Sequence, residues 1–253
     1  MAKSKGAITE VYTLPSKGLL YGDSFGSEVT IRSMTTFEEK MRLGNQGFFK
    51  TMCAILDSVV ISPESYETQY MTLFDFYFLM YKMRTVSYGP TYKVNVTCPV
   101  CGHQEIVKVN LDDLEVKYLD DSVVEPIKIG PLPRSGDTLG CRFLRVVDTI
   151  NNEKKAKEIL NKSPNYVGDP QYILNRVSQI VSINREEKTP AEIQMYVEEM
   201  QAMDSAYYTQ AYEKATEDVG LLTMCDGVCS SCGEELRFSL PFNSEFFRPT
   251  FDL

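Results

Sequence analysis

The hydrophobic pattern along residues 1 to 60 changes from one period to another. Up to residue 33, apolar residues alternate with Gly, Ser and Pro, which predicts short strands joined by turns. From residue 35 to residue 60 they recur at helical spacing, with a break near Gly44 and Gly47. Thr35 and Glu38 have the spacing of a capping box at the start of a helix. We therefore expect strands first and then two helices.

Residues 72 to 87 form an apolar segment of helical length. Phe74, Phe76, Phe78 and Leu79 are distributed around the whole predicted helix rather than along one face. A helix that is hydrophobic all round is buried on most sides. We expect this helix to be enclosed by the rest of the chain or by a partner protein.

Alternating apolar residues also flank two cysteine pairs. Residues 92 to 109 predict a β-hairpin with Cys98 and Cys101 at its tip, and a second hairpin is predicted around Cys229 and Cys232. The segment between the hairpins starts with two predicted strands within residues 123 to 147. It continues with helices at about 150 to 160, 171 to 184, from Thr189 onward, and 204 to 219.

The composition is that of an ordinary globular protein. With 253 residues, 43% of them hydrophobic, the chain can bury a sizeable core in one domain or two. A formal net charge of −9 and a pI near 4.8 repel a phosphate backbone, because nucleic-acid affinity comes largely from Lys and Arg. Nucleic acid is therefore not an expected partner.

No targeting or membrane segment is predicted. The opening Met1-Ala-Lys-Ser-Lys-Gly6 is not followed by an apolar run, as it would be in a secretory signal. The most apolar stretch, Met71 to Met83, contains Asp75 and Lys82 and is shorter than the ~20 residues that span a bilayer. We expect a protein made in the cytoplasm, where its seven cysteines stay reduced.

The two cysteine pairs predict a metal site. Cys98-x-x-Cys101-Gly102 and Cys229-x-x-Cys232-Gly233 have the same pattern, that of a zinc knuckle: two thiolates of a tight turn face one ion, and the glycine supplies a positive φ. Two knuckles give four thiolates, which close a tetrahedral zinc site without an open position for a substrate. In a compact zinc ribbon the pairs are roughly 15–20 residues apart. Here the pairs are separated by the much longer segment from 102 to 228.

We therefore expect an α+β fold: a split four-cysteine zinc ribbon with a large, mostly helical insertion and an N-terminal region of strands and helices. The expected divisions, in chain order, are the N-terminal region 1–91, the first knuckle hairpin 92–118, a strand pair with the helical insertion 119–220, and the second knuckle hairpin with an aromatic tail 221–253.

Other interpretations of the cysteines are weaker. The pairs could be reduced cysteines without a metal, or a redox pair, although a redox cysteine normally begins a helix. Cys225, Cys229 and Cys232 have the spacing of an iron–sulfur motif, but the chain from 233 to 253 is too short for the large domain that such a motif normally opens. Cys53 and Cys141 have apolar neighbours and are expected to be buried.

The sequence predicts no active site. The single histidine, His103, follows a knuckle and is expected to be a surface residue near the metal rather than a ligand. The glycine-rich segment from Gly18 to Gly26 lacks the ending of a phosphate loop and is expected to be a turn. The acidic pairs at 112–113 and 120–121 lie in highly charged, turn-like sequence and are expected to be solvated.

Several segments, in this order, resemble the baseplate hub proteins of T-even-type contractile-tailed phages. These segments are Tyr12-Thr-Leu-Pro-Ser-Lys-Gly-Leu-Leu-Tyr21, Leu73-Phe-Asp-Phe-Tyr-Phe-Leu-Met-Tyr-Lys82, the knuckle Thr97-Cys-Pro-Val-Cys-Gly102, and Leu111-Asp-Asp-Leu-Glu-Val116. The likeness covers roughly residues 1 to 150 and the final knuckle.

The resemblance implies a structural role in the tail tip of the virion, without catalysis and with other baseplate proteins as partners. An assembly factor that is absent from the mature particle and a zinc-ribbon protein that binds nucleic acid are the alternatives. The end of the chain carries Phe242, Phe246, Phe247 and Phe251, which are expected either to contact partners or to fold back onto the chain's own core.

Overall fold

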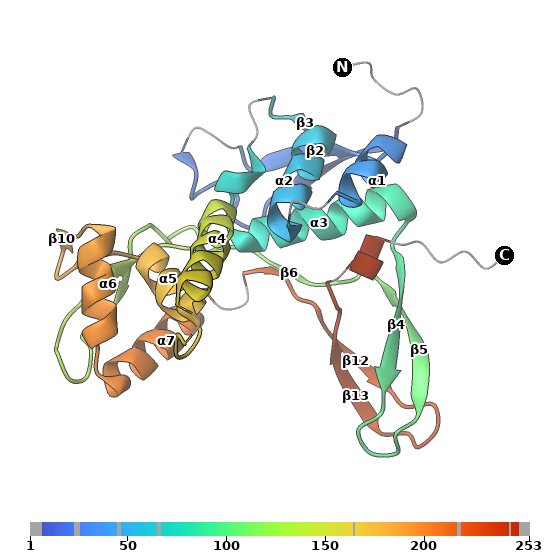
Figure 1. Cartoon of the computed structure of the whole chain (residues 1–253). Helices are drawn as coiled ribbons and strands as arrows, with labels where there is room; N and C mark the ends of the chain where they lie inside the picture. Colours follow the sequence, from blue (N-terminus) through green and yellow to red (C-terminus); the bar gives the residue numbers. More distant parts are fainter. Residues whose placement is uncertain are drawn as a thin grey trace.

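One helix, α3 (Leu73–Tyr88), passes through the middle of the larger of two hydrophobic cores (Figure 1). The computed structural model describes residues 7–22, 26–44, 47–64, 67–163, 165–216, 219–242 and 244–247. Ten of the sixteen residues of α3 are buried, so the helix is enclosed, as its apolar sequence predicts. Thr72 caps its first turn, and Gly89, with a φ of 84°, ends it.

The N-terminal strands and helices pack around α3 and form the first core with it. β1, β2 and β3 form an antiparallel sheet in that order, and α1 and α2 cover α3 from another side (Figure 1). The bounds are β1 (Thr9–Thr13), β2 (Glu28–Arg32), α1 (Thr36–Arg42), α2 (Phe48–Val59), β3 (Val60–Ser62) and the short η2 (Thr68–Tyr70). The predicted break between two helices is confirmed, because α1 and α2 are separate helices.

A buried carboxylate of α3 holds the N-terminal turn in place. Asp75 is fully buried and accepts hydrogen bonds from the backbone N–H of Ser16 at 2.9 Å and from the hydroxyl of Tyr21 at 2.6 Å. Residues 15 to 20 form a turn that includes the start of the one predicted from Gly18 to Gly26, and residues 23 to 25 lie outside the described part of the chain. The opening segment and α3, which together carry the family resemblance, are therefore bound directly to each other.

Two β-hairpins extend from the first core, side by side (Figure 1). The first consists of β4 (Thr91–Thr97) and β5 (Gln104–Asn110), and the second of β12 (Met224–Val228) and β13 (Glu235–Ser239). Each pair is a separate two-stranded antiparallel sheet. A third short pair, β6 (Val116–Lys117) with β11 (Gly220–Leu221), lies where the chain leaves one hairpin and returns to the other.

The segment between the hairpins forms a second core. Its four-stranded sheet has the order β10-β9-β8-β7 and packs against α5, α6 and α7. The bounds are β7 (Ile127–Ile129), β8 (Leu139–Cys141), α4 (Val146–Lys162), α5 (Pro170–Gln179), β9 (Ile180–Ile183), β10 (Glu186–Glu187), α6 (Pro190–Glu199) and α7 (Ala202–Thr216). The mixed α+β class is confirmed.

The prediction of one helix over residues 171 to 184 is wrong at its end. The helix α5 stops at Gln179, and Ile180 to Ile183 form β9, which pairs with β8. Burial alternates along this segment, with Ile180 and Ser182 inside, as in a strand. Asn184 and Arg185 both have positive φ and form the two-residue turn of a hairpin.

The aromatic C-terminal segment folds back onto the first core. Phe246 and Phe247, in η3 (Ser244–Phe247), are 0% and 2% exposed, so these two side chains do not offer a contact surface to partners, and that expectation is corrected. Phe242 packs against the same core and is partly buried, and Phe251 lies outside the described residues. The segment folds back because the first core offers it an aromatic site, where the rings of Tyr81 and Tyr92 pack against the ring of Phe246.

The capping box of α1 contains a buried carboxylate that is bound from three directions. Glu38 is 1% exposed and accepts hydrogen bonds from the backbone N–H of Thr35 at 2.7 Å, from the hydroxyl of Ser58 at 2.7 Å and from the guanidinium of Arg32 at 2.8 Å. Burial raises the pKa of Glu38, but these donors outweigh it and lower the pKa to about 2.

Replacing Glu38 with glutamine is expected to lower the free energy of unfolding at pH 7 by about 1–3 kcal/mol, because buried donors lose a charged acceptor. A lowered pKa in the folded state stabilises the protein above the unfolded-state pKa, and this contribution is lost as the pH falls toward about 2. Urea unfolding between pH 5 and pH 2 should therefore show a shallower decline for the variant. Glu39→Gln, in the same helix but one-third exposed, is the control, and an equal effect there would contradict the assignment.

Candidate metal centre

The tips of the two hairpins have the same backbone hydrogen bonds. In the first, Cys98 N–H donates to the carbonyl of His103 at 2.8 Å and Gly102 N–H donates to the carbonyl of Cys98 at 3.0 Å. In the second, Cys229 N–H donates to the carbonyl of Glu234 at 2.8 Å and Gly233 N–H donates to that of Cys229 at 2.9 Å. The two cysteine pairs are therefore held by the same turn.

The glycine after each pair is needed for its conformation. Gly102 and Gly233 have φ values of 71° and 77°, which a residue with a Cβ rarely adopts. A Cβ at either position would meet nothing within 4 Å, so glycine is required there by its backbone conformation and not by a lack of space. This agrees with the positive φ that the sequence pattern predicts at these turns.

The structure brings the four predicted cysteines together. Their sulfur atoms all lie within 4.8 Å of one another. The Sγ atoms of Cys98 and Cys232 are 3.7 Å apart, and those of Cys101 and Cys229 are also 3.7 Å apart, so the close pairs join one hairpin to the other. A tetrahedral zinc with Zn–S bonds of ~2.3 Å requires S–S distances of about 3.8 Å. The donor set and its spacing fit a four-thiolate zinc ion.

The protonation of the four sulfurs is coupled, because they lie so close together. The backbone N–H of Cys101 points at the Cys98 sulfur and lowers the pKa of that thiol to about 7. The backbone N–H of Glu234 lowers the pKa of Cys232, but hydrogen bonding with the Cys101 thiol, burial, and the thiols of Cys229 and Cys98 together raise it to about 12. Four thiolates in this space would repel one another, because four like charges would lie within 4.8 Å. A divalent cation would deprotonate the thiols that coordinate it, and its own positive charge would offset the repulsion between the thiolates.

One side of the cluster is buried and the other faces solvent. Cys98 and Cys229 are 2% and 1% exposed and belong to the first core, whereas Cys101 and Cys232 are exposed. The cluster lies at the outer end of the hairpins, where the two tips meet (Figure 1). It joins two distant parts of the chain, because Cys229 lies 128 positions after Cys101.

A carboxylate beside the cluster also joins the hairpins, a contact that the sequence did not predict. Glu105, on β5, accepts a hydrogen bond from the backbone N–H of Ser230, in the second tip, at 3.1 Å. This N–H lowers the pKa of Glu105, so the carboxylate is ionised at neutral pH. The only signal in the sequence is its position, shortly after Cys101 and at the start of a strand.

The remaining cysteines and the histidine lie outside the cluster. Cys53 and Cys141 are buried, and burial raises the pKa of each thiol to about 12, as expected for unreactive core residues. Cys225 lies on β12 and is partly exposed. His103 is exposed, and its backbone carbonyl, rather than its ring, takes part in the first tip.

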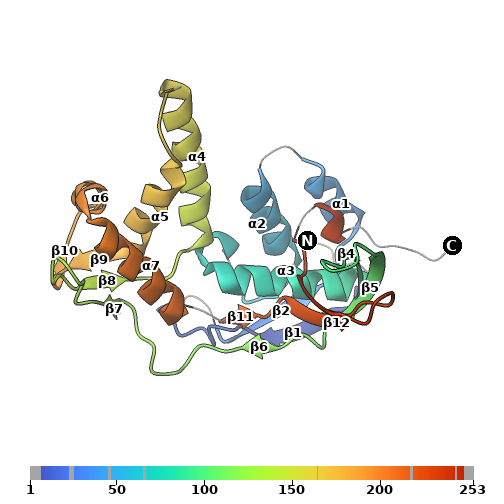
Figure 2. The same cartoon turned by 90° about the horizontal axis from the view of Figure 1, so that it is seen from below.

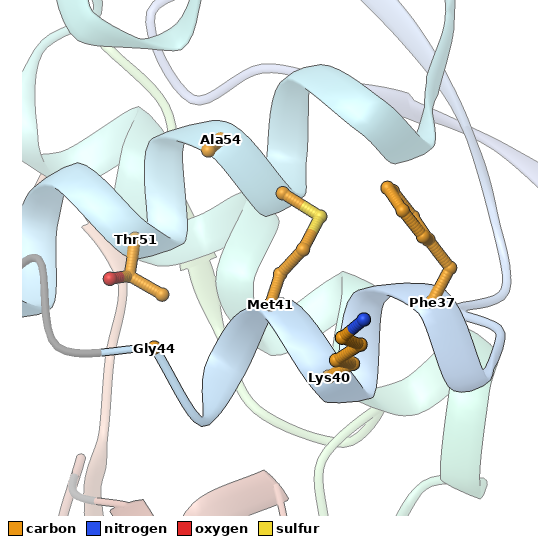
Figure 3. A pocket seen from close by; sticks show the side chains of 6 residues that line it. All are labelled: Phe37, Lys40, Met41, Gly44, Thr51 and Ala54. Atoms are coloured by element: carbon orange, nitrogen blue, oxygen red, sulfur yellow. The ribbon is translucent and has the colours of Figure 1, made fainter.

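A hollow of about 260 Å³ lies between α1 and α2 (Figure 3). Phe37, Met41 and Ala54 give it an apolar wall, and Lys40 is the one titratable residue among the six that line it. It therefore does not bring an acid and a base together.

Among the described residues, no helix combines the length and the apolar character needed to cross a membrane.

The comparisons with known proteins point to one family. No curated protein and no solved structure gave a match. A family model described as "T4 bacteriophage base plate protein" matches residues 8–248, which include both hairpins, all four clustered cysteines and the helical segment from 150 to 220 that the resemblance in sequence did not cover. Because the match extends over nearly the whole chain, the protein belongs to the T4 bacteriophage base plate protein family.

Proposed function

We propose that the protein is a non-catalytic structural subunit of the baseplate hub, stabilised by one zinc ion bound to Cys98, Cys101, Cys229 and Cys232. The family implies a component of the virion tail whose partners are other baseplate proteins. The family match supports the role in the baseplate, and the observation that carries the zinc site is the clustering of four thiols from two distant hairpins within 4.8 Å. Four thiolates fill the coordination sphere of zinc, which is typical of a structural site.

The zinc ion would act as a cross-link between the two hairpins. An isolated two-stranded hairpin is marginally stable in water, and the two hairpins here are not paired with each other by backbone hydrogen bonds in the described sheets. Binding of the ion would therefore fix their relative position. In this proposal the ribbon is formed by the two hairpins, and the segment from 119 to 220 is its insertion. The protein is made in the host cytoplasm before it enters the tail.

The alternative with support from the family is an assembly factor that leaves before the particle matures. The two functions differ in where the protein is found. Mass spectrometry of purified tails should detect the chain in a fixed ratio to other baseplate proteins, and a deletion of its gene should yield particles without functional tails. Tails that lack the chain, although its deletion prevents their assembly, would favour the assembly factor and contradict the hub subunit.

A zinc ribbon that binds nucleic acid is the second alternative. The exposed charges on the hairpins are mixed, with Arg237 and Lys108 set against Glu234 and Glu235. Such a surface offers few contacts for a phosphate backbone. Tight, salt-sensitive binding to DNA or RNA would be the result that supports this alternative.

A further inference from the structure

The C-terminal half of α4, residues 154 to 162, is basic, although the protein as a whole is acidic. Its exposed side chains include four lysines, Lys154, Lys155, Lys157 and Lys162. Glu158 is the exposed acid among them, and Glu153 is partly buried. Within the described part of the chain, none of the four lysines has a hydrogen-bond or ion-pair partner. Their charge is therefore available to another molecule.

The same end of α4 exposes apolar side chains. Leu160 is 45% exposed, and in the turn that follows the helix Tyr166 and Val167 are 40% and 94% exposed. Apolar residues surrounded by charge are typical of contact surfaces between proteins. We call these three residues and the four lysines the arm.

A cleft on the same chain has the complementary character. It has a volume of about 620 Å³ and lies between β11, β12 and the loop that precedes β6. Its apolar lining includes Leu114, Leu221 and Met224. Its exposed charges are three carboxylates, from Asp113, Glu115 and Asp226, against one guanidinium, from Arg237. The cleft is therefore apolar inside and net negative at its rim.

The arm and the cleft of one molecule lie on opposite sides. In Figure 2, α4 projects from one side of the protein, and β6 and β11 lie at the other. The base of α4 is fixed, because Val146 is buried in the first core and Asn152 is hydrogen bonded to Asn175 and Ser178 of α5. The arm is held away from the cleft of its own chain.

We propose that the arm of one molecule binds in the cleft of a second copy of this chain. The lysines face the carboxylates of the rim, and Leu160, Tyr166 and Val167 cover the apolar lining. The contact joins two different surfaces, so each molecule still has a free arm or a free cleft, and further copies can add until a ring closes or a chain of copies forms.

The test uses the full-length protein in sedimentation velocity experiments. The wild type is expected to form dimers and larger species as its concentration rises. This association should weaken by at least tenfold between 0.1 M and 1 M salt, where the screening length falls from ~10 Å to ~3 Å. A protein that stays monomeric at every concentration in 0.1 M salt overturns the proposal.

Two charge-reversed variants identify the surfaces. The arm variant, Lys155→Glu with Lys157→Glu, and the cleft variant, Glu115→Lys with Asp226→Lys, are each expected to be monomeric. Mixed together they should form a complex again, because the unchanged arm of the cleft variant fits the unchanged cleft of the arm variant. Restoration also shows that both variants are folded. Failure to form a complex on mixing overturns the proposal.

The matched control for the arm variant is Lys50→Glu with Lys214→Glu, which makes the same change in net charge as that variant, at exposed helical positions outside both surfaces. It is expected to associate as the wild type does. Equal loss of association in the control would show an effect of total charge and would contradict the proposed contact.

Discussion

Cys98→Ser is expected to lose the metal and to lower the free energy of unfolding by more than about 4 kcal/mol, a size that is typical of metal loss and exceptional for a single substitution. The sulfur of Cys98 is 3.7 Å from that of Cys232, across the two hairpins, and its side chain is 2% exposed. Its removal leaves three ligands, of which only Cys101 comes from the first hairpin, and so weakens the link between the hairpins. Free energy of metal binding becomes free energy of folding at such a site.

The matched control is Cys225→Ser, a substitution of the same kind on the strand that leads to the second tip but outside the cluster. It is expected to keep one zinc ion per chain and nearly the wild-type stability. The measurements are metal content by elemental analysis and urea unfolding with and without a chelator. With a chelator, the wild type should unfold at the same urea concentration as Cys98→Ser. Full zinc content in Cys98→Ser, or iron as the main metal in the wild type, would contradict the assignment.

Features encoded by neighbouring residues could be predicted from the sequence. The box of Thr35 and Glu38 and that of Thr189 and Glu192 both begin helices, since each involves residues three positions apart. The positive φ of Gly102 in the first hairpin tip was predictable too, because the knuckle pattern involves only neighbouring residues. The association of the two distant knuckles was also predictable, because a half-filled metal site requires a second pair of ligands wherever that pair lies in the chain.

Features that depend on distant contacts could not be predicted in this way. Ile180 to Ile183 continue an amphipathic helix in sequence, and only pairing with β8 makes them a strand. Glu105 bonds to Ser230, 125 residues away, and no local pattern indicates that contact. The aromatic C-terminal segment was equally compatible with an interface and with the chain's own core, and its environment on α3 decides between them.

Arg84 connects this C-terminal segment to the first core. It is 3% exposed, and its guanidinium donates hydrogen bonds to the carbonyls of Gly89, Thr91 and Phe246. The same guanidinium lies 5.2 Å from the centre of the Tyr92 ring and 5.6 Å from that of Phe246. The end of α3, the start of the first hairpin and η3 are thus joined at one buried side chain.

Phe246→Ala is therefore expected to lower the free energy of unfolding by about 3–5 kcal/mol, the usual cost of replacing a fully buried phenylalanine with alanine. The ring is 0% exposed, and its centre lies 4.6 Å from that of Tyr81 and 5.2 Å from that of Tyr92, so its removal leaves a cavity between α3 and the first hairpin. Thermal and urea unfolding measure the effect. Phe37→Ala, at a site 60% exposed, should change stability by less than about 1 kcal/mol.

Deleting residues 242 to 253 should have a larger effect than Phe246→Ala, because the deletion also removes Phe242 and Phe247, which pack in the same cluster. The truncated chain is expected to aggregate or to unfold at a lower temperature, although it keeps the four clustered cysteines. A truncated chain that keeps wild-type stability and zinc content but fails to enter tails would contradict this prediction. It would show that the segment contributes to assembly through contacts with partners rather than through the fold.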